Sequence, residues 1–294
     1  MGYRLEDLER LRDQRFRRLP RLRVHNARRA LEFIDDVGFC LVFTNRPRQL
    51  PCLWVAVCGR RDPVFPEHSH HDPELMLTWN LKDRLPAKRL VYYGKLIFGK
   101  PSMLSLAQFP HFYAIHGPQH DEQYRYEYED GLLSRAAKQI MDALTERHPQ
   151  TTKELKWGSR LHTPGSRPIF DQAIAELQRR MYIAMIEARY DPAFTYVWDL
   201  LEAWLPQPIA CGREIPRDEA VYRLAAHYLS VVSYASLAHL ERVVGVSRAE
   251  VGAAVSRLQE EGAIESGVPI EGLPGKWVVW KEVATRGQPT FHAP

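Results

Sequence analysis

Residues 170–183 read FDQAIAELQRRMYI and residues 251–264 read VGAAVSRLQEEGAI, and the two stretches align with an offset of 81 residues. Their apolar positions coincide and repeat at the i, i+4, i+7 spacing of one helix face. The matched pairs are Phe170 with Val251, Ile174 with Val255, and Leu177 with Leu258. Extended outward, the match covers residues 132–205 and 218–281. A repeat of this length indicates two copies of one structural unit.

The C-terminal copy, residues 217–283, predicts three helices followed by a hairpin. Ser247 and Glu250 have the spacing of a capping box, in which each side chain satisfies a free backbone N–H at the start of a helix. Gly245 suits the left-handed end of the helix before it. The predicted elements are a helix over 219–232 capped by Asp218, a helix over 237–244, a third helix after Ser247, and strands over 263–270 and 276–283 around a turn at 271–275.

The central copy, residues 131–206, follows the same plan. Thr151 and Glu154 form a second capping box, which opens a short helix toward Trp157. Pro168 suits the first turn of a helix. The predicted elements are a helix over 132–147, this short helix, a helix over 169–180, and strands over 182–189 and 194–198 around Asp191-Pro192.

Helix, short helix, longer helix and hairpin is the order of a winged helix-turn-helix, a fold used mostly to lie against DNA. We therefore predict an α+β, helix-rich fold with tandem winged helix-turn-helix units. The alternative is an ordinary α+β core whose helices and hairpins happen to follow this order. The chain of 294 residues is long enough for two or three small domains.

Composition narrows the class of protein. The net charge is only +4, no apolar run reaches membrane-spanning length, and the start lacks the apolar stretch of a signal peptide. The four cysteines show neither CxxC metal spacing nor a secreted disulfide pattern; they are Cys40, Cys52, Cys58 and Cys211. We expect a cytoplasmic, reduced, monomeric protein that does not bind a membrane and needs no cofactor.

The two ends of the chain have their own composition. The first thirty residues hold ten arginines against four acidic residues. Residues 1–23 are thus predicted to be a basic arm that neutralises phosphates, or else a solvated helix that happens to use arginine. Residues 284–294 are predicted to be a loose tail.

Residues 24–130 form a different, aromatic-rich α+β region, which a divergent winged helix would also fit. A helix is predicted over 27–37, a buried strand over 39–43, a strand or hairpin arm over 90–98 and an aromatic helix over 105–116. Tyr93 and Lys95 would share one face of their strand, so an aromatic ring and a cation could meet a displaced base there. The alternative is that these aromatic residues simply fill a core.

Two clusters in this region have residue types that carry chemistry. The run His68-Ser69-His70-His71-Asp72 offers metal ligands, but its spacing matches no helical zinc motif and prolines bracket it as a loop. We therefore predict no metal site. Lys82-Asp83 could be a nucleophile beside an acid for lyase chemistry at a sugar carbon, or an ordinary pair on a helix surface.

The order of elements resembles the crosslink-repair DNA glycosylases of the AlkZ/YcaQ type over roughly residues 25–281. The resemblance is carried by FTYVWDLLEAWLP (194–206) and by YASLAHLERVVGVSRAEVGAAVSRLQEEGAIESGVPIEG (234–272). It implies tandem winged helices clustered around a DNA-facing concave surface, and a role in DNA repair with double-stranded DNA, intact or damaged, as the partner.

The same resemblance implies a catalytic Gln-hydrophobic-Gln or Gln-hydrophobic-Asp triplet after a turn near the N-terminus. In this chain the matching stretch is 37–43, so that Leu41 and Phe43 occupy the two polar positions. Neither side chain can orient a water molecule or stabilise an oxocarbenium-like sugar. The expected function is a lesion or structure binder, or a glycosylase with a rearranged active site. The alternatives are a transcriptional regulator and a winged helix that binds other proteins.

Basic residues at the predicted helix starts, third helices and second wing are the expected phosphate contacts, which set the position of a protein on DNA. They are Lys153, Arg160, Arg167, Arg179, Arg180, Arg248, Arg257 and Lys276.

Overall fold

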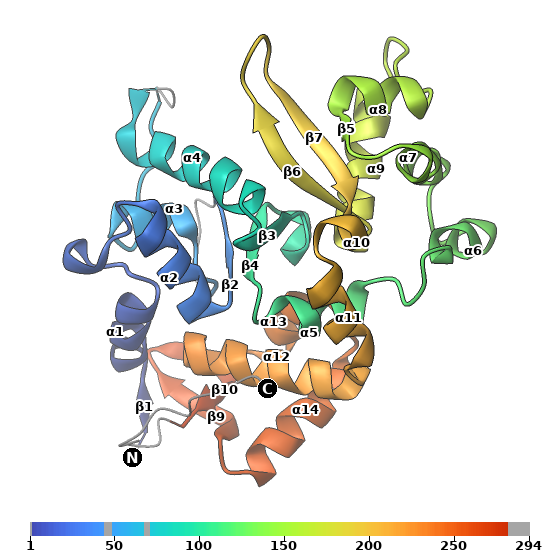
Figure 1. The fold of residues 1–294 in the computed structure, drawn as a ribbon. Coiled ribbons are helices and arrows are strands. Elements are labelled where there is room, and N and C mark those ends of the chain that lie inside the picture. The colour runs from blue at the N-terminus through green and yellow to red at the C-terminus, as the bar shows by residue number, and fades with distance from the viewer. Residues whose placement is uncertain (1, 44–48, 68–70, 282–294) are drawn as a thin grey trace.

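The computed structural model describes residues 2–43, 49–67 and 71–281. Its helices and strands fall into three groups, which Figure 1 shows as an N-terminal group in blue and cyan, a central group in green and yellow, and a C-terminal group in orange and red.

The central group has the topology of a winged helix. Its three-stranded sheet has the order β5-β7-β6, so the short first strand pairs with the last one and the final two strands form the wing hairpin. The elements are α7 (Arg135–Glu146), β5 (Gln150–Thr151), α8 (Thr152–Gly158), α9 (Arg167–Arg179), β6 (Ile183–Arg189) and β7 (Thr195–Leu200).

The C-terminal group repeats this topology, with the order β8-β10-β9. Its elements are α12 (Arg217–Val232), β8 (Tyr234–Ala235), α13 (Leu237–Val244), α14 (Arg248–Glu260), β9 (Ile264–Glu271) and β10 (Leu273–Trp280). Helices α9 and α14 both have 13 residues and begin 81 residues apart, at Arg167 and Arg248. Both predicted capping boxes, at Thr151 and Ser247, are present.

The N-terminal group shows the same order a third time, β2-β4-β3. Its elements are α2 (Ala27–Val37), β2 (Phe39–Leu41), α3 (Leu53–Cys58), α4 (Pro73–Ala87), β3 (Val91–Gly94) and β4 (Ser102–Ser105). The predicted fold class, helix-rich α+β with tandem winged helices, is confirmed. We call the three groups the N-terminal, central and C-terminal units.

Short helices connect the units. α5 (Phe109–His116) and α6 (Gln123–Glu129) lie between the N-terminal and central units in the chain. α10 (Leu201–Trp204) and α11 (Pro206–Glu214) lie between the central and C-terminal units. Single turns of 3-10 helix occur at η1 (Pro20–Leu22) and η3 (Ile97–Gly99). Within the described ranges, none of the helices combines the length and apolarity needed to cross a membrane.

The first residues of the chain belong to the C-terminal unit. β1 (Tyr3–Arg4) adds a parallel strand to β9, and α1 (Leu5–Arg15) follows it. Arg12 is 1% exposed and donates to the carbonyl oxygens of Val232 at 2.6 Å and Tyr234 at 2.7 Å. Arg18 is also buried and pairs with Glu9. The predicted basic arm and its alternative, a solvated helix, were both wrong for Arg12 and Arg18. Their guanidinium groups make contacts within the protein and do not face phosphate or solvent.

The hairpin of the central unit separates two hydrophobic cores. Ile183 and Met185 of β6 pack into the core of the central unit. Ala184 and Ile186, which alternate with them, pack into a larger core that the N-terminal and C-terminal units share. Successive side chains of a strand point to opposite faces, so this one sheet buries both of its faces.

Two predicted boundaries in the C-terminal unit were wrong. α12 begins at Arg217 after Pro216, so Asp218 lies within its first turn and is not the cap. The hairpin turns tightly at Gly272, whose φ of +87° lies in the left-handed region that glycine adopts readily. Leu273 and the residues after it are therefore strand, where the composition of 271–275 had indicated a longer turn.

Candidate nucleic-acid interface

The helix-turn-helix of the central unit is α8, residues 159–166 and α9. The capping box fixes the start of α8: the hydroxyl oxygen of Thr151 accepts from the Glu154 amide at 3.3 Å, and the Glu154 carboxylate accepts from the Thr151 amide at 2.8 Å. The hydrogen bond from the Thr151 hydroxyl is the first cause that lowers the pKa of Glu154. This cap sets the direction of α8 and the orientation of the side chains on its outer face.

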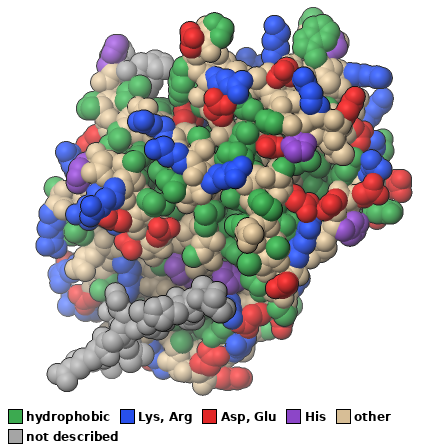
Figure 2. Space-filling model, viewed as in Figure 1, with side chains coloured by type: hydrophobic (Ala, Val, Ile, Leu, Met, Phe, Trp, Pro, Cys, Tyr) green, Lys and Arg blue, Asp and Glu red, His purple; other side chains and the backbone are tan. Residues whose placement is uncertain are grey.

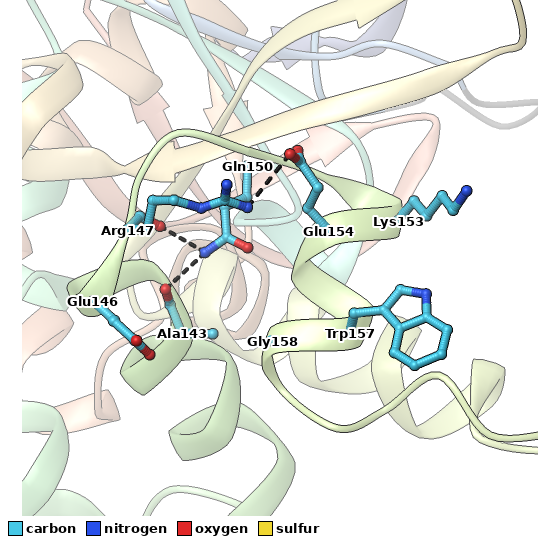
Figure 3. A pocket seen from close by; sticks show the side chains of 8 residues that line it. All are labelled: Ala143, Glu146, Arg147, Gln150, Lys153, Glu154, Trp157 and Gly158. Carbon is cyan, nitrogen blue, oxygen red and sulfur yellow. Dashed lines mark hydrogen bonds and ion pairs between the residues drawn. The ribbon is translucent and has the colours of Figure 1, made fainter.

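A hollow of about 550 Å³ lies beside α8 (Figure 3). Lys153 and Trp157 extend outward from α8 on the same side, whereas Glu146 lies at the other end of the hollow. At the base, the buried Gln150 amide donates to the carbonyl oxygens of Ala143 at 2.7 Å and Arg147 at 2.6 Å. The lining residues are Ala143, Glu146, Arg147, Gln150, Lys153, Glu154, Trp157 and Gly158. Acidic and basic groups are mixed here, so the hollow is not a phosphate pocket.

Four of the expected DNA contacts are exposed on or next to this helix-turn-helix. Lys153 lies on α8, Arg160 in the connecting segment, Arg167 at the start of α9 and Arg179 at its end. The Arg167 side chain is 84% exposed, and its ion pair with Asp171 is long, at 3.7 Å. These guanidinium and ammonium groups can reach solvent-borne phosphates without breaking a buried contact.

Two other candidates, Arg180 and Arg257, form short ion pairs with other residues of the protein. Arg180 donates to the Glu127 carboxylate at 2.9 Å. Arg257 donates to Glu219 at 2.7 Å and lies 3.6 Å from the centre of the Tyr222 ring. Both side chains therefore fix neighbouring helices, a role that the sequence pattern could not separate from phosphate binding.

The last two candidates lie on the C-terminal unit. Arg248 is 80% exposed at the start of α14 and has Glu241 at 3.8 Å. Lys276 is exposed on β10. Figure 2 shows that basic side chains are spread over the upper part of this face, with acidic ones between them, and form no unbroken patch.

A second cluster joins α4 of the N-terminal unit to the wing of the central unit. Lys82 of α4 is 1% exposed, and its ammonium group donates to Asp83 and, at 3.0 Å, to the hydroxyl oxygen of Tyr196. The Tyr190 hydroxyl donates to the other oxygen of Asp83. The Tyr190 pKa is raised, first by burial and then by this carboxylate. We call Lys82, Asp83, Tyr190 and Tyr196 the Lys82 cluster.

Aromatic rings surround the Lys82 ammonium group. It lies 5.1 Å from the centre of the Trp79 ring, 5.4 Å from that of Tyr93 and 5.0 Å from that of Tyr196. Lys82 and Asp83 are therefore neither an exposed pair on a helix surface nor a nucleophile that solvent can reach, the two alternatives that the sequence left open. Burying an ion pair costs desolvation energy that its mutual attraction only partly returns. Its clearest structural effect is to bind α4 to the wing.

The residues at the two catalytic positions of the resembling family are both apolar, and Phe43 packs on the Trp79 ring that faces Lys82. Leu41 is buried in β2, with 6% of its surface exposed. Phe43 is partly buried, and its ring centre lies 4.6 Å from that of Trp79. Both residues make packing contacts, as their apolar chemistry requires.

The predicted stacking pair lies in a more interior position than expected. Tyr93 packs against both hydrophobic cores, and burial is the first cause that raises its pKa. Lys95 is partly buried beyond the end of β3. Exposed rings occur instead on Trp79, at 40%, and at the wing tip on Tyr190, at 64%, and Phe194, at 55%. Sequence reasoning missed these three because their grouping depends on the contact between two units.

The histidine-rich run is described only in part, since His68, Ser69 and His70 lie outside the described residues. Asp72 caps α4, where its carboxylate accepts from the Leu75 amide at 2.7 Å. Among the residues that the structure describes, no three metal-ligating side chains come together.

Comparisons with known proteins agree with this architecture. A search of the solved structures matches Streptomyces sahachiroi DNA glycosylase AlkZ with a TM-score of 0.60, at 14% sequence identity, over 96% of this chain and 71% of that chain. At this identity the match shows a shared fold. A search of curated proteins gives no match. The family model described as AlkZ related matches residues 24–245, which is most of the chain. The protein therefore belongs to the AlkZ-related family, as the sequence resemblance implied.

Proposed function

We propose that this protein binds double-stranded DNA in DNA repair and recognises damaged or distorted sites. The observation that carries the proposal is the exposed basic set on the central helix-turn-helix, in a chain with three winged helices of the AlkZ-related family. A helix-turn-helix presents its second helix to DNA and uses the surrounding residues to hold the backbone.

The phosphate contacts are assigned first to Lys153, Arg160, Arg167 and Arg179. Their side chains are exposed, so a phosphate would compete with water and at most with one long surface ion pair. Arg248 and Lys276 extend the same role to the C-terminal unit. Arg180 and Arg257 would have to give up short ion pairs, so we assign them to the fold.

We also propose that no base is excised through the positions of Leu41 and Phe43. Placing a polar catalytic group at the buried Leu41 without a partner would cost about 1–3 kcal/mol, and leucine itself offers no group to activate water. Wild-type protein incubated with an alkylated or crosslinked duplex and then heated in base should leave the strands intact. Cleavage that persists in Leu41→Ala would place the chemistry elsewhere in the molecule.

Salt dependence of duplex binding tests the proposed contacts. The logarithm of affinity should fall with the logarithm of salt concentration with a slope of about −0.9 per phosphate neutralised. Lys153→Ala combined with Arg160→Ala should make that slope shallower by almost 2 and weaken binding equally on unrelated sequences. A control pair with the same charge change, Arg10→Ala and Arg28→Ala on α1 and α2, should leave the slope unchanged.

Two outcomes would reject the proposal. One is affinity that is indifferent to both salt and the Lys153/Arg160 substitutions. The other is a preference of about 10³-fold or more for one undamaged sequence, which is the behaviour of a transcriptional regulator.

A further inference from the structure

The outer stripe of α4 has an unusual composition for a helix in the DNA-facing position of a winged helix. Met76 is 39% exposed and Trp79 is 40% exposed, with Asn80 beside them, at the spacing of one helix face. The next position of this stripe is Asp83, which belongs to the Lys82 cluster. Met76 and Trp79 offer flexible or flat apolar surface, Asn80 is a neutral amide and Asp83 is a buried carboxylate, so none of the four suits a phosphate group.

The wing tip of the central unit brings more aromatic surface to the same place. Tyr190 is 64% exposed and Phe194 is 55% exposed, and their ring centres are 5.3 Å apart. Phe194 also lies edge-on to Tyr196, at 4.9 Å. Tyr196 in turn binds Lys82, whose ammonium group lies against Trp79. Rings from two units are thus held around one buried cation.

We propose that Trp79, Tyr190 and Phe194, which we call the aromatic subsite, accept an unpaired nucleobase of the bound DNA. The inference rests on the proposed function, since it names the part of the molecule that would recognise a distorted site. Every base has a π-face, so exposed aromatic rings bind unpaired bases with little sequence preference. A base is extruded at least cost where pairing is already weak, which gives selectivity for damaged or mismatched DNA.

The distribution of charged groups favours a nucleobase over other occupants of the aromatic subsite. Lys82 is enclosed and already donates to Asp83 and Tyr196, so it offers no free charge to a phosphate at this place. Exposed cations that can hold the DNA backbone lie on α8 and α9, and Arg84 of α4 and Arg189 next to the wing tip are exposed as well, the latter paired with Glu187 at 2.8 Å. A second copy of the chain would also cover exposed rings, and sedimentation separates that case.

Asp83 is a positioning residue in this scheme. It accepts the Tyr190 hydroxyl and the Lys82 ammonium group, and so fixes the wing tip relative to α4. Tyr190→Phe keeps the ring and removes this anchor. It should lower the preference for unpaired DNA less than Tyr190→Ala, because the stacking surface remains.

The test compares two duplexes of one sequence, one fully paired and one with three unpaired nucleotides at its centre, by fluorescence anisotropy with full-length protein. Trp79→Ala and Phe194→Ala should each lower affinity for the unpaired duplex about tenfold, equivalent to ~1.4 kcal/mol. Affinity for the paired duplex should change less than twofold. Trp79→Phe should retain most of the preference. Tyr126→Ala, an exposed aromatic residue on α6, is the matched control and should change neither affinity.

The outcomes distinguish the two proposals. If the wild type binds both duplexes and Trp79→Ala with Phe194→Ala leaves the preference intact, or lowers both affinities equally, the aromatic subsite is rejected and the DNA-binding function stands. A wild type that binds neither duplex rejects both. A wild type that sediments as a dimer, which these substitutions convert to monomer, assigns the rings to a second copy and rejects the subsite. Circular dichroism of each variant verifies folding.

Discussion

The central and C-terminal units have one topology but different outer surfaces. Their third helices have the same length and start 81 residues apart. On the central unit, Lys153, Arg160 and Arg179 remain exposed around the helix-turn-helix. On the C-terminal unit, Arg257 is bound by Glu219 and Glu261. The repeat therefore preserves the residues that pack into a core, while the residues on the outer faces of the two units differ.

The neighbouring elements explain part of this divergence. The sheet of the C-terminal unit is extended by β1 and contacted by α1, so part of its surface serves the assembly of the molecule. The wing of the central unit instead reaches α4 of the N-terminal unit, through Tyr196 and Lys82. The C-terminal unit thus pairs residues 3–4 with residues 270–271, and the central unit carries the candidate contact surface.

The largest expected effect is on the free energy of unfolding, and it concerns equivalent core positions of the central and C-terminal units. Leu177 and Leu258 are equivalent positions, with 0% and 1% exposure, and each packs into a hydrophobic core. Leu177→Ala and Leu258→Ala should each lower the free energy of unfolding by about 2–5 kcal/mol, measured by urea denaturation. Gln259→Ala on the exposed side of α14 should change it by less than about 0.5 kcal/mol. A large loss at one leucine alone would show that the two cores are not equivalent.

A second difference should appear at acidic pH. Burial, then the nearby Arg242 and Arg12, lowers the pKa of His239 on α13 to about 4. Burial, then Arg223 and His227, does the same for His111 on α5. Both have ordinary values of 6.5, so the unfolded chain binds more protons between pH 6.5 and 4. The free energy of unfolding should therefore fall as pH falls through this window, by up to ~1.4 kcal/mol per pH unit for each histidine.

The position equivalent to His239 in the central unit is Glu154, the third residue of α8, so this unit has no histidine there. His239→Gln and His111→Gln should each flatten the loss of stability between pH 7 and pH 4.5, measured by urea denaturation at both values. Parallel losses in wild type and both variants would mean that carboxylates alone set the acid sensitivity.

The smallest predicted effect is on duplex affinity, and it distinguishes the outer faces of the central and C-terminal units. Arg167 and Arg248 are equivalent residues with similarly exposed side chains, 84% and 80%, and similarly long ion pairs. Arg167→Ala should weaken duplex binding about fivefold, ~1 kcal/mol. Arg248→Ala should weaken it about twofold, because the C-terminal unit only extends the contacts of the central unit and Glu241 lies 3.8 Å from Arg248. Equal losses, measured by anisotropy at fixed salt, would place both units on the DNA backbone.

The repeated elements were predictable because their signals are local. Capping boxes, apolar periodicity and the offset of 81 residues fix helices within one unit, and the structure keeps them. The contacts that each arginine side chain makes were not predictable in this way. The partners of Arg12 and Arg257 are Val232 and Glu219, which lie far away in the sequence.

The candidate stacking surface shows the same limit. The alternation of side chains along residues 90–98 predicts a shared face for Tyr93 and Lys95, but it says nothing about which ring another unit covers. Lys82 and Asp83 were noticed as chemistry-bearing residues, yet their partners Tyr190 and Tyr196 lie more than a hundred residues away. Local patterns identify elements, whereas a site between units depends on their packing.

The parallel pairing of Tyr3 with Ile270 has a consequence for the order of folding on the ribosome. β1 must wait until β9 has been synthesised, and at ~5–20 residues per second that delay is roughly 15–50 s. Until Val232 and Tyr234 have been synthesised, the Arg12 guanidinium lacks the carbonyl oxygens that it holds in the finished molecule. The central unit, whose strands and helices are close in sequence, can fold meanwhile. Closure of the β1–β9 pair would then follow the folding of the central unit.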